Sequence, residues 1–230
     1  GTGERGIFNL SAAQSKAPPR RYAPLIQGTN PCGEIMLRDM QFCNLSEVVV
    51  REDDDLDSLL DKVETATWLG VIQSTFTDFP YLRREWKKNC DVERLLGVSL
   101  TGQMDNPSIL TSEALTALKS RVIRISRKAA KVLDVNVPTA TTCVKPSGTV
   151  SQLVDSASGV HPRYSQYYIR RYRIAARDPL FQLVKDSGLK CQPEVGQSKK
   201  DASTWVVDFP VKAPEGCITR KDVTALEQLR

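Results

Sequence analysis

Apolar positions recur with two different spacings along the chain, which predicts helices interleaved with strands. In residues 56–72 the apolar side chains return every three or four positions, as on one face of a helix. The acidic residues 52–55 precede this stretch, where carboxylates favour the start of a helix. Similar signals predict further helices at residues 112–133 (capped by Thr111 or Ser112), 178–187 (ended by Gly188) and 219–230 (capped by Thr219 or Asp222).

Short runs rich in β-branched residues predict the strands. They lie at residues 42–51, 92–101, 166–176 and 203–209, and residues 135–145 are also expected to be extended. Strands that alternate with helices are typical of an α/β fold with a largely parallel sheet and crossover helices. We therefore expect the α/β class and one domain over residues 1–230.

The composition is ordinary for a globular protein, with 40% hydrophobic and 26% charged residues. No apolar run reaches the roughly 20 residues of a membrane-spanning helix. The net charge of +5 is a mild excess, and one stretch mixes arginines with tyrosines: Arg163, Tyr164, Tyr167, Tyr168, Arg170, Arg171, Tyr172, Arg173 and Arg177. Such a stretch can bind nucleic acid, but we favour a strand with solvated arginines on one face and packed tyrosines on the other, or a site for a small phosphate-bearing ligand. Neither a nucleic acid nor a membrane is an expected partner.

Six cysteines, at positions 32, 43, 90, 143, 191 and 217, include no Cys-x-x-Cys pair, so a zinc ribbon is not expected. The first residues contain no apolar signal-peptide core, which favours a reducing cytoplasm and free thiols. His161 is the only histidine, which argues against a zinc site and against a Ser-His-Asp hydrolase. A cysteine that matters for function would then be reactive or redox-active.

The most informative cysteine is Cys32, in the run Asn-Pro-Cys-Gly-Glu at residues 30–34. Pro31 restricts the residue before it to extended backbone, and Gly33 permits a sharp turn. A thiol and a carboxylate two residues apart in such a loop can face one small ligand, and Cys43 follows at the start of a predicted strand. The alternative is a buried free cysteine beside a surface glutamate.

A second segment, Lys-Pro-Ser-Gly-Thr-Val-Ser at residues 145–151, predicts a tight turn that opens a short helix. Small hydroxyl residues and a glycine at a helix start present free backbone N–H groups, which can hold a phosphate. The spacing is not that of a P-loop. An ordinary capped helix is the alternative interpretation.

Together these segments resemble the ribonucleotide reductases, specifically the adenosylcobalamin-dependent (class II) enzymes of the monomeric, triphosphate-reducing type. The residues that carry the resemblance occur in the family's order, at positions 28–35, 42–45, 96–102, 144–152 and 158–164. The Asn-x-Cys-x-Glu loop alone is a weak pattern. The second cysteine and the Pro-Ser-Gly-Thr segment at these separations make it specific, and the resemblance covers most of residues 1–190.

The resemblance implies a ten-stranded α/β barrel made of two halves, with a central finger loop that carries the radical cysteine. This chain would hold part of that catalytic barrel, and Cys32 would be the radical cysteine. Adenosylcobalamin would supply a 5′-deoxyadenosyl radical that converts Cys32 into a thiyl radical, which abstracts the 3′ hydrogen of a ribonucleotide. A thiyl radical suits this step because the S–H bond and that C–H bond are comparable in strength.

The resemblance also implies roles for the neighbouring residues. Glu34 would take the proton of the 3′-hydroxyl, and Asn30 would hydrogen-bond the ribose hydroxyls. Cys43 would be one of two cysteines that end as a disulfide, which a thioredoxin-type or other dithiol reductant would reopen. The substrate would be a ribonucleoside di- or triphosphate, reduced to a deoxyribonucleotide for DNA synthesis. Its phosphates would be bound by Ser147, Gly148, Thr149 and Val150.

Several parts that the resemblance leads one to expect are not found in this sequence. They are the partner of Cys43, the effector site and a C-terminal cysteine pair, and Cys90, Cys143, Cys191 and Cys217 match no redox position of the family. The sequence also begins without a methionine. We therefore expect a fragment that is inactive alone.

Two other functions stay open. One is a fragment of a class I large subunit, which takes its radical from a partner protein. The other is a catalytically silent nucleotide-binding module that keeps the fold.

Overall fold

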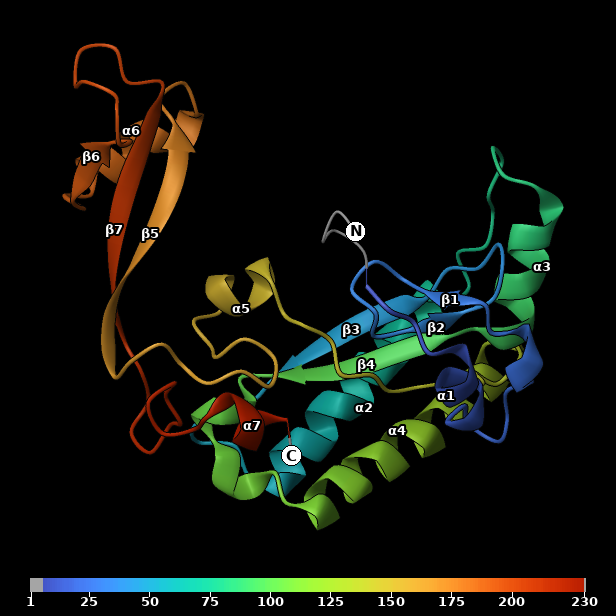
Figure 1. Cartoon of the computed structure of the whole chain (residues 1–230). Coiled ribbons are helices and arrows are strands. Elements are labelled where there is room, and N and C mark those ends of the chain that lie inside the picture. The colour runs from blue at the N-terminus through green and yellow to red at the C-terminus, as the bar shows by residue number, and fades with distance from the viewer. Residues whose placement is uncertain (1–5, 230) are drawn as a thin grey trace. The chain divides into compact units, whose positions relative to one another are not determined.

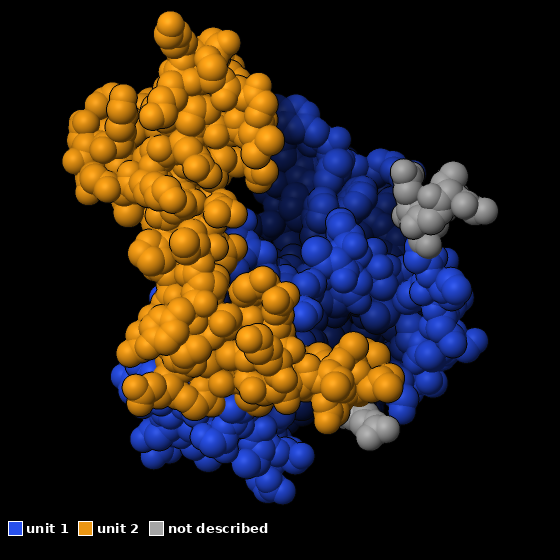
Figure 2. Space-filling model, turned by 60° about the vertical axis from the view of Figure 1, so that its left-hand side comes forward, with its two compact units in different colours: residues 1–162 blue, residues 163–230 orange. Residues whose placement is uncertain are grey.

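The computed structural model describes residues 6–229, and the chain divides into two compact units, residues 1–162 and 163–230 (Figure 2). The first unit holds most of the helices and a parallel pair of strands, and the second is built on a small antiparallel sheet (Figure 1). The fold is thus mixed α/β. Whether the two units act as the single domain expected from the sequence stays a prediction.

The first unit mixes helices and strands. Their order is α1 (Leu10–Ser15), the 3₁₀ turn η1 (Ala23–Leu25), β1 (Gly28–Thr29), β2 (Met36–Leu37), β3 (Asn44–Val49), α2 (Leu56–Gln73), α3 (Arg84–Glu93), β4 (Leu96–Thr101), the 3₁₀ turns η2 (Gln103–Asp105) and η3 (Pro107–Ile109), α4 (Ser112–Val132) and α5 (Thr149–Leu153). Among residues 6–229, no helix is both long and apolar enough to cross a bilayer.

Strands β3 and β4 pair in parallel, and Thr142 forms a parallel bridge with Val98 on the other side of β4. Helices α2 and α4 lie together beneath this sheet (Figure 1). The core between them is aliphatic and consists of Val48, Val50, Leu59, Val63, Ala66, Val98, Leu118 and Val122. Because side chains alternate along a strand, Leu45 and Glu47 of β3 point to the opposite face of the sheet.

The predicted long helices and the first strand are confirmed. Asp55 caps α2 in a reciprocal capping box with Ser58, and Thr111 caps α4. The strand expected over residues 92–101 is wrong at its start, because α3 continues to Glu93. Arg94 then adopts a left-handed backbone conformation (φ 43°), which ends the helix two residues before β4 begins.

The second unit has the strand order β5 (Tyr167–Ala175), β7 (Thr204–Lys212), β6 (Cys191–Pro193), with all pairs antiparallel. Helix α6 (Pro179–Asp186) follows β5, and its Phe181 packs on Ile174 and Val207. The strands at 166–176 and 203–209 and the helix at 178–187 are confirmed, but the expectation of a largely parallel sheet is wrong for this unit.

The helix predicted at 219–230 shortens to α7 (Ala225–Gln228), which Thr224 caps. The two predicted caps bond to each other instead, since the Thr219 amide and hydroxyl both donate to Asp222 Oδ2. This local turn uses up the side-chain acceptor that a longer helix would need.

The mixture of arginines and tyrosines lies largely on β5. The expectation of solvated arginines is confirmed for Arg171, Arg173 and Arg177 and is wrong for Arg163, which is buried. Arg171 and Arg173 pair with Asp208 and Glu194. The packed tyrosines are wrong for Tyr167 and Tyr172, which are 68% and 59% exposed. Because neighbouring carboxylates offset part of the positive charge, the strand itself does not form a strong basic surface.

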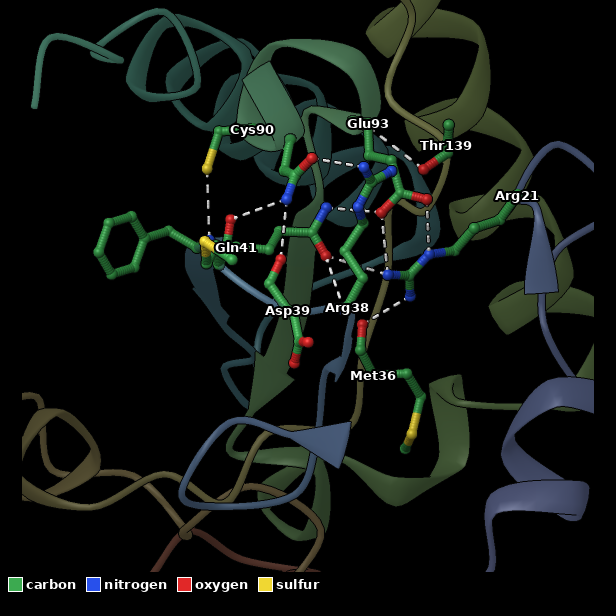
Figure 3. A network of polar contacts seen from close by, with 11 residues as sticks. Arg21, Met36, Arg38, Asp39, Gln41, Cys90, Glu93 and Thr139 are labelled. Atoms are coloured by element: carbon green, nitrogen blue, oxygen red, sulfur yellow. Dashed lines mark hydrogen bonds and ion pairs between the residues drawn. The ribbon is translucent and has the colours of Figure 1, made fainter. Parts of the chain in front are cut away.

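A buried ion pair joins three separate parts of the first unit (Figure 3). Arg21 Nε donates to Glu93 Oε1 at 3.1 Å and Nη2 to Oε2 at 3.0 Å, and both side chains are almost inaccessible. Arg21 Nη1 also donates to the Met36 carbonyl at 2.5 Å, and Gln41 bridges the arginine and the carboxylate. The network therefore ties the N-terminal segment to β2 and to the end of α3.

We expect Arg21→Ala to lower the free energy of unfolding by about 3–5 kcal/mol, because it leaves the Glu93 carboxylate buried without its cation. Urea denaturation followed by circular dichroism measures this. The matched control is Arg121→Ala, which breaks a more exposed pair with Glu64 and should cost less than about 1 kcal/mol. If both variants lose the same free energy of unfolding, the buried pair contributes no more than the exposed one, and the expectation is wrong.

Candidate active site

The run at residues 30–34 forms the tip of a short antiparallel hairpin made by β1 and β2. The Asn30 amide donates to the Ile35 carbonyl at 3.1 Å, and the Gly33 amide donates to the Asn30 carbonyl at 3.0 Å. Gly33 has a φ of +83°, a conformation that glycine adopts without strain. The turn leaves Cys32 as an exposed free thiol at the tip.

The side chain of Asn30 helps to hold this turn. Its Oδ1 accepts a hydrogen bond from the Ile35 amide at 3.0 Å. An amide side chain also carries two N–H donors on its nitrogen. Asn30 can therefore shape the loop through its oxygen and bind a ligand oxygen through its nitrogen.

Glu34 follows the turn, and both of its carboxylate oxygens are buried without a hydrogen-bond partner among residues 6–229. A carboxylate only accepts hydrogen bonds, and burial without a donor is costly. Buried oxygens without a hydrogen-bond partner occur at sites where a bound ligand or a proton satisfies them. The Glu34 carboxylate could therefore accept a hydrogen bond from a hydroxyl group of a bound ligand.

The residue after Glu34 rests on the face of the sheet opposite α2 and α4. A Cβ atom on Gly97 of β4 would lie 2.5 Å from Leu45 Cδ2, 2.9 Å from Cys143 Sγ and 2.9 Å from Ile35 Cδ1. Only glycine leaves room for these three side chains at once. Gly97 thus lets the hairpin settle on the sheet between β3 and the extended segment that carries Cys143.

Two partly buried thiols lie on this side of the sheet. Burial raises the pKa of Cys43, and the Glu34 charge raises it further. Burial also raises the pKa of Cys143 to about 12, with added contributions from Glu34, Cys43 and Glu47. Both thiols therefore stay protonated at neutral pH, and the structure brings Glu34, Cys43 and Cys143 into one electrostatic neighbourhood.

Two residues of this neighbourhood, Glu47 and Cys143, are not predicted from the sequence. Glu47 has both carboxylate oxygens buried and without a partner in the described chain, as Glu34 does. Strand alternation could have found it, because residues 43, 45 and 47 share one face of β3. Cys143 gives no such signal, since its closeness to Glu34 depends on how the hairpin folds over the sheet.

The predicted phosphate segment lies at the start of α5, as expected. Ser147 is 6% exposed and its hydroxyl has no described hydrogen-bond partner, whereas Gly148, Thr149 and Val150 are exposed. The Ser158 hydroxyl donates to the Ser147 carbonyl and so steadies the segment. Among residues 6–229, no hydrogen bond or ion pair joins this segment to the Cys32 loop, so their cooperation stays a prediction.

The lone histidine is exposed, and its Nδ1 lies 3.0 Å from the Ser158 carbonyl. Within the described part of the chain, no three His, Cys, Asp or Glu side chains cluster in a way that could hold a metal ion. All six cysteines are free.

Comparison with known proteins gives relatives of one kind. The chain is 30% identical to the adenosylcobalamin-dependent ribonucleoside-triphosphate reductase of Levilactobacillus brevis and 29% identical to that of Lactobacillus leichmannii. Each similarity covers 92% of this chain and 32% of the relative. The chain therefore spans about a third of the length of these curated relatives. No family model matches it.

Solved structures agree with the relatives. A crystal structure of a B-12 dependent (class II) ribonucleotide reductase matches 94% of this chain and 35% of that protein, with a TM-score of 0.75 and 25% identity. The alpha subunit of the Actinobacillus ureae class Id ribonucleotide reductase matches 81% of this chain and 41% of that protein, with a TM-score of 0.56 and 22% identity, which shows a shared fold alone.

We expect Gly97→Ala to destabilise the first unit by about 1–3 kcal/mol, because its Cβ would overlap Leu45, Cys143 and Ile35. Urea denaturation measures the loss. Gly28→Ala is the control, since a Cβ there meets no atom within 4 Å. If both substitutions cost the same, the close packing at Gly97 does not hold the hairpin.

The Glu34 carboxylate should also control thiol reactivity. The thiolate is the form that alkylates, so Glu34→Gln should lower the pKa of Cys43 and Cys143 and speed their reaction with iodoacetamide at about pH 9. Mass spectrometry of the labelled peptides measures each rate. Glu85→Gln, on the exposed side of α3, removes the same charge and should change neither rate. Unchanged rates in Glu34→Gln would place its carboxylate away from the thiols.

Proposed function

The chain is a relative of the adenosylcobalamin-dependent ribonucleoside-triphosphate reductases, and on this premise we propose that it is the radical-bearing segment of a ribonucleotide reductase. The activity is the reduction of a ribonucleoside di- or triphosphate to the deoxyribonucleotide that DNA synthesis needs. One observation carries the proposal: a hairpin tip that exposes the Cys32 thiol and, two residues later, buries a carboxylate without a partner. The first unit would be part of a ten-stranded barrel with this hairpin as its central finger.

Cys32 would act as the hydrogen-abstracting thiol. A large cofactor could reach the Cys32 thiol, because this thiol is exposed, whereas the thiols of Cys43 and Cys143 are partly buried. When bound, adenosylcobalamin supplies the radical that removes the hydrogen atom of the Cys32 thiol. Cys32 then takes the 3′ hydrogen of the ribose and returns it at the end. The Gly33 turn and the Asn30 hydrogen bonds hold the sulfur in place meanwhile.

Glu34 would be the base for the 3′-hydroxyl. Its oxygens have no partner in the described chain, so they are free to accept the hydroxyl proton once the ribose is bound. Proton removal there helps the neighbouring 2′-hydroxyl to leave as water. The Asn30 Nδ2 group would donate to the same ribose hydroxyls and orient them between the thiol and the carboxylate.

Cys43 would deliver reducing equivalents. Its pKa is raised by burial and by Glu34, so it carries its proton until the reaction consumes it. Oxidation of Cys43 together with a second thiol gives a disulfide, two protons and the two electrons that the substrate needs. A dithiol reductant of the thioredoxin type would restore the two thiols, in a cytoplasm that keeps cysteines free.

The phosphates of the substrate would bind at residues 147–150. The orphaned Ser147 hydroxyl and the exposed backbone of Gly148, Thr149 and Val150 supply the donors. The Ser158 hydroxyl donates to the Ser147 carbonyl and holds this loop in place. Gly159 packs closely against the loop, since a Cβ there would lie 3.0 Å from the Lys145 carbonyl oxygen.

A chimera tests this function. This chain would replace the matching third of the Lactobacillus leichmannii reductase, and we expect exchange of tritium from 5′-labelled adenosylcobalamin and ribonucleotide reduction to persist. Cys32→Ser should abolish both, and Glu34→Gln should lower reduction by about 10²–10⁴-fold.

The control is Cys191→Ala in the second unit, which should leave both activities at the level of the parent chimera. Circular dichroism would confirm that all variants fold. Exchange that persists in a folded Cys32→Ser chimera would remove Cys32 from the radical role, and ribonucleotide reduction without adenosylcobalamin would favour a class I reaction.

A further inference from the structure

The first unit contains a cavity of about 780 Å³, and of the described residues that line it only Glu34 has a role in the proposed chemistry. Its walls come from four parts of the chain: residues 13–21 at and after α1, residues 34–36 of the hairpin, one side of α4, and the extended segment 140–142. Helices α1 and α4 and this extended segment can be followed in Figure 1. The volume falls within the range of small-ligand sites.

The charged groups that line the cavity are strongly unbalanced. Four cations face it, from Lys16, Arg20, Lys119 and Arg127, and among the described residues of its wall Glu34 is the only carboxylate. Within residues 6–229, none of these four cations forms an ion pair. A fifth cation of the wall, Arg21, is already neutralised by Glu93.

Arg20 shows the imbalance most clearly. Its Nε atom is inaccessible and has no acceptor in the described chain, and its Nη2 reaches only the Thr139 carbonyl, at 3.5 Å. Burial and the like charge of Arg127 together lower the pKa of Arg20. Two neighbouring guanidinium groups without a carboxylate repel each other, and an anion between them would relieve that repulsion.

We propose that this cavity is a binding site for a polyphosphate group, separate from the phosphate segment at residues 147–150. A single phosphate carries about two negative charges and would leave about half of the four positive charges unmatched, whereas a chain of three phosphates carries a comparable negative charge and fits the volume. Arg20 and Arg127 would bind phosphate oxygens through their planar donors, and Lys16 and Lys119 would add charge at the rim. The inference does not depend on the proposed reaction.

Isothermal titration calorimetry of the 230-residue chain with inorganic tripolyphosphate tests the proposal. Lys119→Gln/Arg127→Gln should weaken binding by about tenfold or more, because both removed charges face the cavity. The matched control is Arg124→Gln/Lys128→Gln, which removes two exposed cations of the same helix that lie outside the cavity and should change affinity by less than about twofold. Ser147→Ala should also leave this binding event unchanged.

Arg20→Lys provides a second measure, since it keeps the charge but removes the buried Nε donor and should also weaken binding. A parallel titration with a nucleoside triphosphate identifies the source: tighter binding than tripolyphosphate indicates a nucleotide, and equal binding indicates a free polyphosphate. Failure of the wild-type chain to bind either probe, equal weakening in the two double variants, or loss of binding in Ser147→Ala alone would overturn the proposal.

Discussion

The hairpin that carries Cys32 depends on the buried ion pair between Arg21 and Glu93. Its two strands pair at only two positions each, and so short a hairpin is not stable by itself. Arg21 binds the Met36 carbonyl at its base and the Glu93 carboxylate at the end of α3 in one bidentate arrangement. A buried pair of this kind costs desolvation, so it adds little net stability compared with an apolar pair, although loss of one partner is costly because the other charge stays buried. Its value is to hold separate segments in one position.

The sheet separates the structural and chemical parts of the first unit. One face of β3 and β4 is aliphatic and packs on α2 and α4, and it forms the core. The other face carries Cys43, Glu47 and the glycine at position 97, on which the hairpin rests. Strand alternation thus lets one short sheet stabilise the fold with half of its side chains and build a reactive surface with the rest.

Unsatisfied groups mark that surface more clearly than any single motif does. Among residues 6–229, Glu34 and Glu47 bury acceptors that have no donor, Ser147 buries an unpaired hydroxyl, and Arg20 buries a donor that has no acceptor. In a folded protein most buried polar atoms are paired, so this concentration in one unit indicates partners from outside the described chain.

The sequence by itself determined the long helices, most of the strands, the turn that carries Cys32 and the turn before α5, because local periodicity, caps and turn residues encode them. It could not determine the antiparallel second unit or the end of α3, where strand pairing and a left-handed Arg94 decide the outcome. Only the tertiary structure placed Cys143 near both Glu34 and Glu47, and only it brought Lys16 and Arg127 to the wall of one cavity. These residues are distant in sequence, and only packing of the hairpin and helices on the sheet brings them within electrostatic range.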